Sequence, residues 1–134
     1  MRVLVDTSVW INYFGGGAKS SPLDRLIDDD LIVTNEIILA ELLPLLIVKR
    51  QKRLVGLLKK VALASLSVDW NEIIDFQTHC IKSGINGIGI PDLIIAQNAK
   101  QGHCAIYSLD KHFEMIKEIA GIKIFTDVKS AYRL

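Results

Sequence analysis

Four acidic residues stand where carboxylates are able to do chemistry, each in a different part of the chain. They are Asp6, Glu41, Asp92 and Asp110. Asp6 ends the apolar run 3–5, which is typical of a strand covered on both faces in a parallel sheet. Ligands of open α/β sheets bind beyond the carboxyl ends of the strands, so an acid at this point is placed where such sites occur.

Three of these acids also have a simpler explanation. Asp6, or Thr7 or Ser8 after it, is able to cap a helix that begins there. Asp92 follows Pro91 at an expected helix start, where the helix dipole favours a negative charge, and Asp110 also suits a cap.

Glu41 is the acid that such local roles explain least. Its neighbours at three and four residues include Ile37, Ile38, Leu42 and Leu45. An ionised carboxylate in apolar surroundings is costly unless a cation or hydrogen-bond donors compensate it. Four acids brought together would also raise one another's pKa values unless divalent cations lie among them, and oxygen ligands of this kind select Mg²⁺ or Mn²⁺.

The elements that must position the acids alternate along the chain. Strands are expected at 2–6, 31–34, 62–68, 104–109 and 122–125, and helices at 8–14, from 21–22 to about 27, at 36–48, 70–82 and 92–101, with a last one marked by Phe113, Ile116 and Ile119. This order predicts a mostly parallel sheet with helices on both faces. Asn35 should cap the helix 36–48, and Pro44 should kink or restart it. On the helix 70–82, we expect Ile73, Ile74, Phe76, Gln77 and Cys80 to point inward.

Composition limits the class of protein. With 134 residues the chain is long enough for one domain, 1–134, with a real core. Half of the residues are apolar and the mean hydropathy is +0.31, which predicts an interface with another copy or a partner protein. No apolar run approaches the roughly 20 residues of a membrane helix, and no signal peptide is visible, so a cytoplasmic location is expected. Cys80 and Cys104 have no zinc-ligand spacing and are expected to be buried thiols.

One segment is strongly basic although the net charge is only +1. Lys49, Arg50, Lys52 and Arg53 are followed by Lys59 and Lys60, with leucines at helical spacing between them. Such a segment is suited to contact a phosphate backbone. A solvated outer face of an amphipathic helix explains it equally well.

Four stretches of the sequence resemble the motifs of the PIN-domain ribonucleases and, within that family, of the VapC-type toxins of toxin-antitoxin pairs. They are 5–11 (VDTSVWI), 39–43 (LAELL), 90–96 (IPDLIIA) and 108–113 (SLDKHF). The first is fairly specific, and the others gain weight from their order and spacing. The resemblance spans the chain from Arg2 to about Phe125.

The resemblance implies a fold, an activity and a site. The fold would be a three-layer α/β/α sandwich around a short, mostly parallel sheet, and the activity that of an endoribonuclease in which Mg²⁺, or Mn²⁺, activates water. Asp6, Glu41, Asp92 and Asp110 would form the metal cluster, with Ser8 and Ser108 as nearby hydroxyls. The partners implied are an RNA substrate, a cognate antitoxin and a second copy in a homodimer. Two departures bear on helix packing: Gln97 and Asn98 stand where small apolar residues are commoner, and Pro44 follows Glu41 closely. Ser108 stands where Thr is more usual.

Two other functions were weighed against this one. A PIN-like scaffold that binds RNA or protein without cleavage has little reason to keep Glu41 in apolar surroundings. A phosphatase of the haloacid-dehalogenase type also begins with an acid after its first strand, but it needs a second Asp two residues later, where this chain has Ser8.

Overall fold

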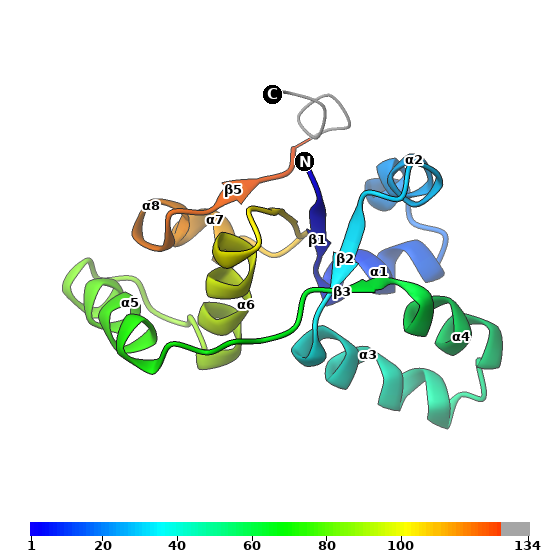
Figure 1. Cartoon of the computed structure of the whole chain (residues 1–134), viewed down its shortest axis with the longest axis horizontal. Helices are drawn as coiled ribbons and strands as arrows, with labels where there is room; N and C mark the ends of the chain where they lie inside the picture. Colours follow the sequence, from blue (N-terminus) through cyan, green and yellow to red (C-terminus); the bar gives the residue numbers. More distant parts are fainter. Residues whose placement is uncertain (127–134) are drawn as a thin grey trace.

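Five short strands form one parallel sheet in the computed structural model, which describes residues 1–126 (Figure 1). They are β1 (Val3–Val5), β2 (Ile32–Thr34), β3 (Ala62–Leu63), β4 (Ala105–Tyr107) and β5 (Lys123–Ile124). Their order is β3-β2-β1-β4-β5, and every neighbouring pair is parallel. The chain therefore builds the sheet outward from β1 in one direction and then in the other, so the order reverses between β1 and β4. Such a switch point is where α/β sheets bind their ligands.

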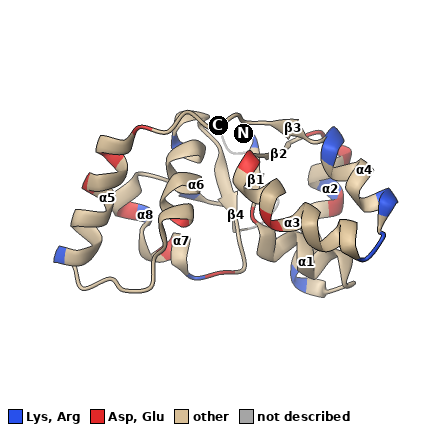
Figure 2. Cartoon of the chain, turned by 90° about the horizontal axis from the view of Figure 1, so that it is seen from below, with Lys and Arg blue, Asp and Glu red and all other residues tan. Residues whose placement is uncertain are grey.

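Helices cover both sides of this sheet, which confirms the expected α/β/α sandwich. They are α1 (Thr7–Phe14), α2 (Pro22–Asp28), α3 (Glu36–Val48), α4 (Lys52–Lys60), α5 (Trp70–Lys82), α6 (Ile90–Gln101), α7 (His112–Met115) and α8 (Lys117–Ala120), with a short 3-10 helix η1 (Ala18–Ser20). Seen from below, α4 and α5 lie at opposite ends of the molecule (Figure 2).

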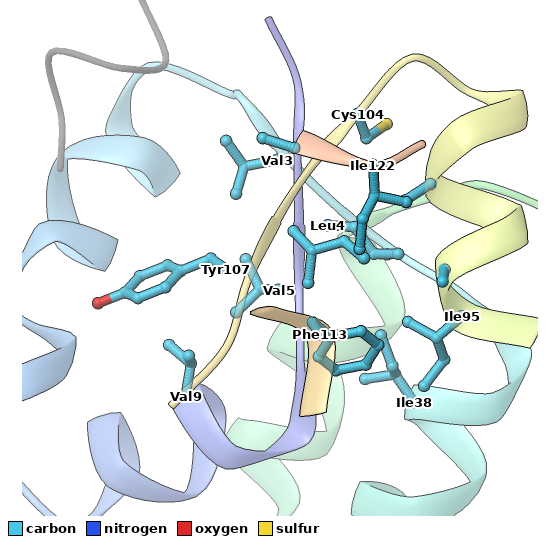
Figure 3. Packing of buried hydrophobic residues seen from close by; sticks show 14 of the residues in the cluster. Val3, Leu4, Val5, Val9, Ile38, Ile95, Cys104, Tyr107, Phe113 and Ile122 are labelled. Carbon is cyan, nitrogen blue, oxygen red and sulfur yellow. The ribbon is translucent and has the colours of Figure 1, made fainter. Parts of the chain in front are cut away.

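The side chains of β1 alternate between the two layers of helices. Val3 and Val5 point to the side of α1, whereas Leu4 points toward Ile38 of α3 and Ile95 of α6 (Figure 3). All five are buried. Because both faces of β1 are covered, its sequence is an unbroken apolar run and does not alternate with polar residues.

The α3 helix begins as expected but is not interrupted. Asn35 Oδ1 accepts a hydrogen bond from the Ile38 N–H at 2.9 Å, which confirms the predicted cap. The expected restart at Pro44 is wrong, because α3 continues to Val48. Pro44 and Ala40 are both exposed, so water is able to satisfy the Ala40 carbonyl that loses its donor.

The third strand is shorter than expected. It ends at Leu63, and side chains satisfy the backbone beyond it. The Leu66 N–H donates to the Glu36 carboxylate at 3.0 Å, and the Asp69 N–H donates to Gln97 Oε1 at 3.1 Å. The single helix expected after Asp110 is also two short ones, α7 and α8.

Gln97 and Asn98 strengthen the packing of α6, contrary to the expectation that they would disturb it. Both are buried. Asn98 Oδ1 accepts a hydrogen bond from Asn35 Nδ2 at 3.0 Å, and Asn98 Nδ2 donates to the Ala64 carbonyl at 3.0 Å. Gln97 Nε2 donates to the Asp69 carbonyl at 3.0 Å. Because their polar groups are paired, these amides connect α6 to the cap of α3 and to the segment before α5.

Two expectations about composition can be compared with the fold. Cys80 and Cys104 are buried free thiols, as predicted. In the described part of the chain, no helix is long and apolar enough to cross a membrane.

Candidate active site

Asp6 lies at the end of β1, at the switch point of the sheet. It occupies the position before α1, yet its side chain makes no capping hydrogen bond. Its Oδ2 atom accepts hydrogen bonds from Ser8 Oγ at 2.9 Å and from Ser108 Oγ at 2.8 Å, and the residue is only 8% exposed. Capping therefore does not explain this acid, which two hydroxyl groups hold in place.

The two serines also join β1 to the loop after β4. Ser8 Oγ accepts the Leu109 N–H and Ser108 Oγ accepts the Asp110 N–H, each at 3.0 Å. Each hydroxyl thus donates to Asp6 and accepts from the loop that carries Asp110. This arrangement fixes the position of that loop relative to Asp6.

Asp92 and Asp110 meet at the imidazole of His112. Its Nδ1 atom lies 3.0 Å from Asp92 Oδ2 and 3.3 Å from Asp110 Oδ2. Asp110 Oδ1 also accepts the His112 N–H at 3.0 Å, so the capping explanation of Asp110 holds in part. Asp92 lies in the first turn of α6, where the dipole favours it, but it makes its hydrogen bond across the site.

Glu41 is exposed, so the expectation of a buried carboxylate on α3 was wrong. The helix turns Ile38 and Leu42 into the core and leaves Glu41 on its open side. Partial burial of its carboxyl raises the pKa of Glu41, and the negative charges of Asp6 and Asp92 raise it further. Glu41 is therefore within electrostatic reach of two other acids of the set.

The pKa of Asp92 reports on the remaining neighbours. Burial raises it most, the hydrogen bond and charge of His112 lower it, and the charges of Asp110 and Asp6 raise it again. Repulsion between like charges thus connects all four acids, although they come from β1, α3, α6 and the loop after β4.

The four acids do not yet enclose a metal-sized space. Among residues 1–126, no group of three or more His, Cys, Asp or Glu side chains is arranged to hold a metal ion. The contacts within the group are the serine pair on Asp6 and the imidazole between Asp92 and Asp110.

The basic residues lie apart from these contacts. Lys49, Arg50, Lys52 and Arg53 are all exposed, on the α3–α4 connection and the first residues of α4. Within the part of the chain that the structure describes, none of the four forms an ion pair with an acid.

His112 is the site residue to which the sequence alone gave no role. It belongs to the stretch 108–113, and its place two residues after Asp110 would have been the signal, because a side chain at that spacing is able to turn back over the preceding acid. Its contact with Asp92, however, joins residues 20 positions apart and depends on the fold.

The model of the PIN domain family matches residues 3–119, which is most of the chain. The chain belongs to the PIN domain family. Proteins of this family are generally nucleases that use divalent metal ions. No curated protein shows significant similarity to the sequence.

Solved structures agree with this fold. FitAcB of Neisseria gonorrhoeae superposes with a TM-score of 0.69 at 20% identity, over 98% of this chain and 99% of the other. VapBC2 of Rickettsia felis, bound to a DNA fragment from their promoter, gives 0.73 at 18% identity over 93% and 98%. VapC20 of Mycobacterium tuberculosis, a toxin that cleaves the sarcin-ricin loop, gives 0.59 at 16% identity over 84% and 93%. Similarity at these identities establishes the shared fold.

Proposed function

We propose that this protein is an Mg²⁺- or Mn²⁺-dependent endoribonuclease and the toxin of a toxin-antitoxin pair. The observation that carries the proposal is the mutual electrostatic effect of Asp6, Glu41, Asp92 and Asp110 at the switch point of a PIN-family sheet. The structural neighbours support it, since one of them is a toxin that cleaves an RNA loop.

The donor set fits a divalent cation. Carboxylate oxygens are the ligands that Mg²⁺ and Mn²⁺ prefer, and a bound cation relieves the repulsion that raises the pKa values of Glu41 and Asp92. Asp6, Glu41, Asp92 and Asp110 would hold it. Such an ion, when bound, lowers the pKa of a water molecule and stabilises negative charge on the phosphate and the leaving oxygen.

The other residues of the site position these acids. Ser8 and Ser108 both donate their hydroxyl protons to Asp6, so we assign them an orienting role and take water as the attacking group. His112 restrains Asp92 and Asp110 from one atom, Nδ1. Partners of this kind fix the direction in which metal ligands point.

Cleavage of labelled RNA tests the proposal. The purified protein should cut RNA in Mg²⁺ and lose the activity in EDTA, and Asp6→Asn and Asp92→Asn should abolish cleavage with an unchanged far-UV circular dichroism spectrum. Asp28→Asn, an exposed acid of α2, is the matched control and should keep full activity. Full activity of the Asp6→Asn protein would overturn the assignment, and RNA binding without cleavage at saturating Mg²⁺ would favour a non-catalytic binding module.

We also propose that Lys49, Arg50, Lys52 and Arg53 contact the RNA backbone. Between Glu41 and Asp69 the chain has no acidic residue, so this end of the molecule is locally positive (Figure 2). Neutralising the four should weaken binding of an RNA held uncleaved in Ca²⁺ and flatten its dependence on salt, because fewer counterions are released. An unchanged salt slope would leave these residues as the solvated face of α4.

A groove between α1, α3 and α4 is where we place the cognate antitoxin. It has a volume of about 310 Å³. Its apolar lining is Ile11, Phe14, Leu42, Leu45, Leu46 and Leu54. Of these, Ile11 and Leu45 are 52% and 44% exposed, so the chain itself leaves apolar surface uncovered here. We propose that RNA and antitoxin are met in the cytoplasm. Co-purification of a co-expressed antitoxin should be lost in Leu45→Glu and kept in the α5 variant Asn71→Ala; capture by Leu45→Glu would place it elsewhere.

A further inference from the structure

The α5 helix carries an apolar stripe that faces solvent. Trp70, Ile74 and Ile81 are 57%, 60% and 69% exposed. Residues four and seven positions apart lie on the same side of a helix, so the three form one line along α5. The expectation that Ile74 points inward was wrong.

The chain does not need this stripe for its own packing. Ile73, Phe76 and Cys80, on a neighbouring side of α5, are the residues that enter the core. An apolar line left in water on a helix that already has a buried side indicates a surface for association.

Charge along α5 is divided between its two halves. The acids Asp69, Glu72 and Asp75 come first, and His79 and Lys82 follow. A second α5 lying antiparallel would therefore place the basic half of one helix beside the acidic half of the other. Neither Asp75 nor Lys82 has an ion-pair partner within the described residues, so both remain available for such a contact.

We infer that a second copy of this chain covers the stripe, through a two-fold pairing of antiparallel α5 helices. Placing Ile74 of one copy level with Ile81 of the other aligns the stripes. Asp75 follows Ile74 and Lys82 follows Ile81, so both charged residues lie on the same flank of the helix. In an antiparallel pair these flanks face each other, and the two-fold axis makes the Asp75–Lys82 contact twice.

The other apolar surfaces suit a second copy less well. Leu23 and Leu26 of α2 are buried within the chain. The exposed Ile47 lies in a groove of α3 and α4 that is also lined by Arg50, Lys52 and Lys59. A two-fold axis there would bring like charges together, which is unfavourable. Because α4 and α5 lie at opposite ends of the molecule, an antitoxin and a second copy are able to bind at the same time (Figure 2).

The size of the surface predicts a reversible dimer. With 13 residues, α5 is about 20 Å long, so a helix pair alone is at the small end of specific interfaces. This inference gives a location to the homodimer of the proposed function and does not depend on RNA cleavage.

Sedimentation of the full chain over a range of concentrations, without RNA, tests the inference. The unmodified protein should pass from monomer to dimer, and Ile74→Glu or Ile81→Glu should raise the dissociation constant at least about tenfold, since a charge would be buried at the interface. Val48→Glu changes a residue that is 79% exposed at the end of α3 and should leave the constant unchanged. Thermal unfolding of each variant checks that the fold is kept.

A charge reversal makes the test specific to this pairing. Asp75→Lys should weaken the dimer, because it would face Lys82 of the other copy, and the double variant Asp75→Lys with Lys82→Asp should recover it. A monomer at all concentrations, a dimer insensitive to Ile74→Glu, or a double variant as weak as Asp75→Lys would each overturn the inference. None of these outcomes bears on whether the protein is a nuclease.

Discussion

Replacing Ser108 by Ala removes one of the two hydroxyl groups that hold Asp6. The variant loses the 2.8 Å hydrogen bond from Ser108 Oγ to Asp6 Oδ2 and the 3.0 Å bond that Oγ accepts from the Asp110 N–H. We expect lower stability and weaker binding of Mg²⁺, because Asp6 and the loop after β4 would both be less constrained.

The magnitude follows from the two bonds. A hydrogen bond to a charged group contributes about 1.5–3 kcal/mol. The Asp110 N–H belongs to an exposed residue and is able to bond to water, and Ser8 still donates to Asp6, so the total should be about 2 kcal/mol. Loss of a group that orients a metal ligand typically costs about 10- to 100-fold in metal affinity or activity.

Two measurements check this prediction. Urea unfolding in EDTA gives the change in the free energy of unfolding, and the Mg²⁺ dependence of RNA cleavage gives the change in the apparent metal constant. Ser108→Thr is the control, because it keeps the hydroxyl and should stay within about 0.5 kcal/mol of the unmodified protein.

One result would refute the reasoning. If Ser108→Ala unfolds within about 0.5 kcal/mol of the Ser108→Thr control and needs no more Mg²⁺ for cleavage, the hydroxyl neither stabilises nor orients Asp6. Loss of stability with an unchanged Mg²⁺ dependence would leave Ser108 a structural role alone.

Three further predictions concern the surroundings of the site. In EDTA at pH 7, Glu41→Gln should stabilise the protein by a few tenths of a kcal/mol, because Glu41 is exposed and solvent screens its repulsion. A raised folded-state pKa destabilises only the charged form, so this gain should disappear below the ordinary pKa of the carboxyl; an equal gain at both pH values in urea unfolding would contradict it. Asn98→Ala should cost about 2–3 kcal/mol in the same assay, because buried partners lose their hydrogen bonds, whereas the exposed Asn71→Ala should cost less than about 0.5 kcal/mol. His112→Phe should raise the Mg²⁺ requirement of cleavage about tenfold and His112→Asn less, since Asn keeps a donor; equal effects would argue against positioning through Nδ1.

Much of the framework was predictable because it depends on local pattern. Apolar runs located the strands near their observed places, Asn35 was recognised as a cap, and the alternation of elements predicted a parallel sheet. The acids were visible as candidates from their places after strands or at helix starts. Four motifs in order indicated the family, which the match over residues 3–119 shows.

The directions of side chains on uniformly apolar helices were not predictable. The sequence around Glu41 is apolar at three and four residues on either side, so periodicity gave no reason to prefer the exposed side that the fold assigns to it. On α5, Ile73 and Ile74 both follow a helical pattern, yet only Ile73 is buried. Periodicity fixes the spacing of a face, but the neighbouring elements decide which face is covered.

Contacts between distant segments were decided by the tertiary structure alone. Ser8 and Ser108 are 100 residues apart, and both reach Asp6 because β1 and β4 are adjacent and parallel. His112 meets Asp92 only because α6 and the loop after β4 lie at the same edge of the sheet. The amino-acid sequence by itself determined which residues are able to do chemistry and the order of the elements that carry them. The strand order β3-β2-β1-β4-β5, which local pattern does not encode, decided which of those residues meet.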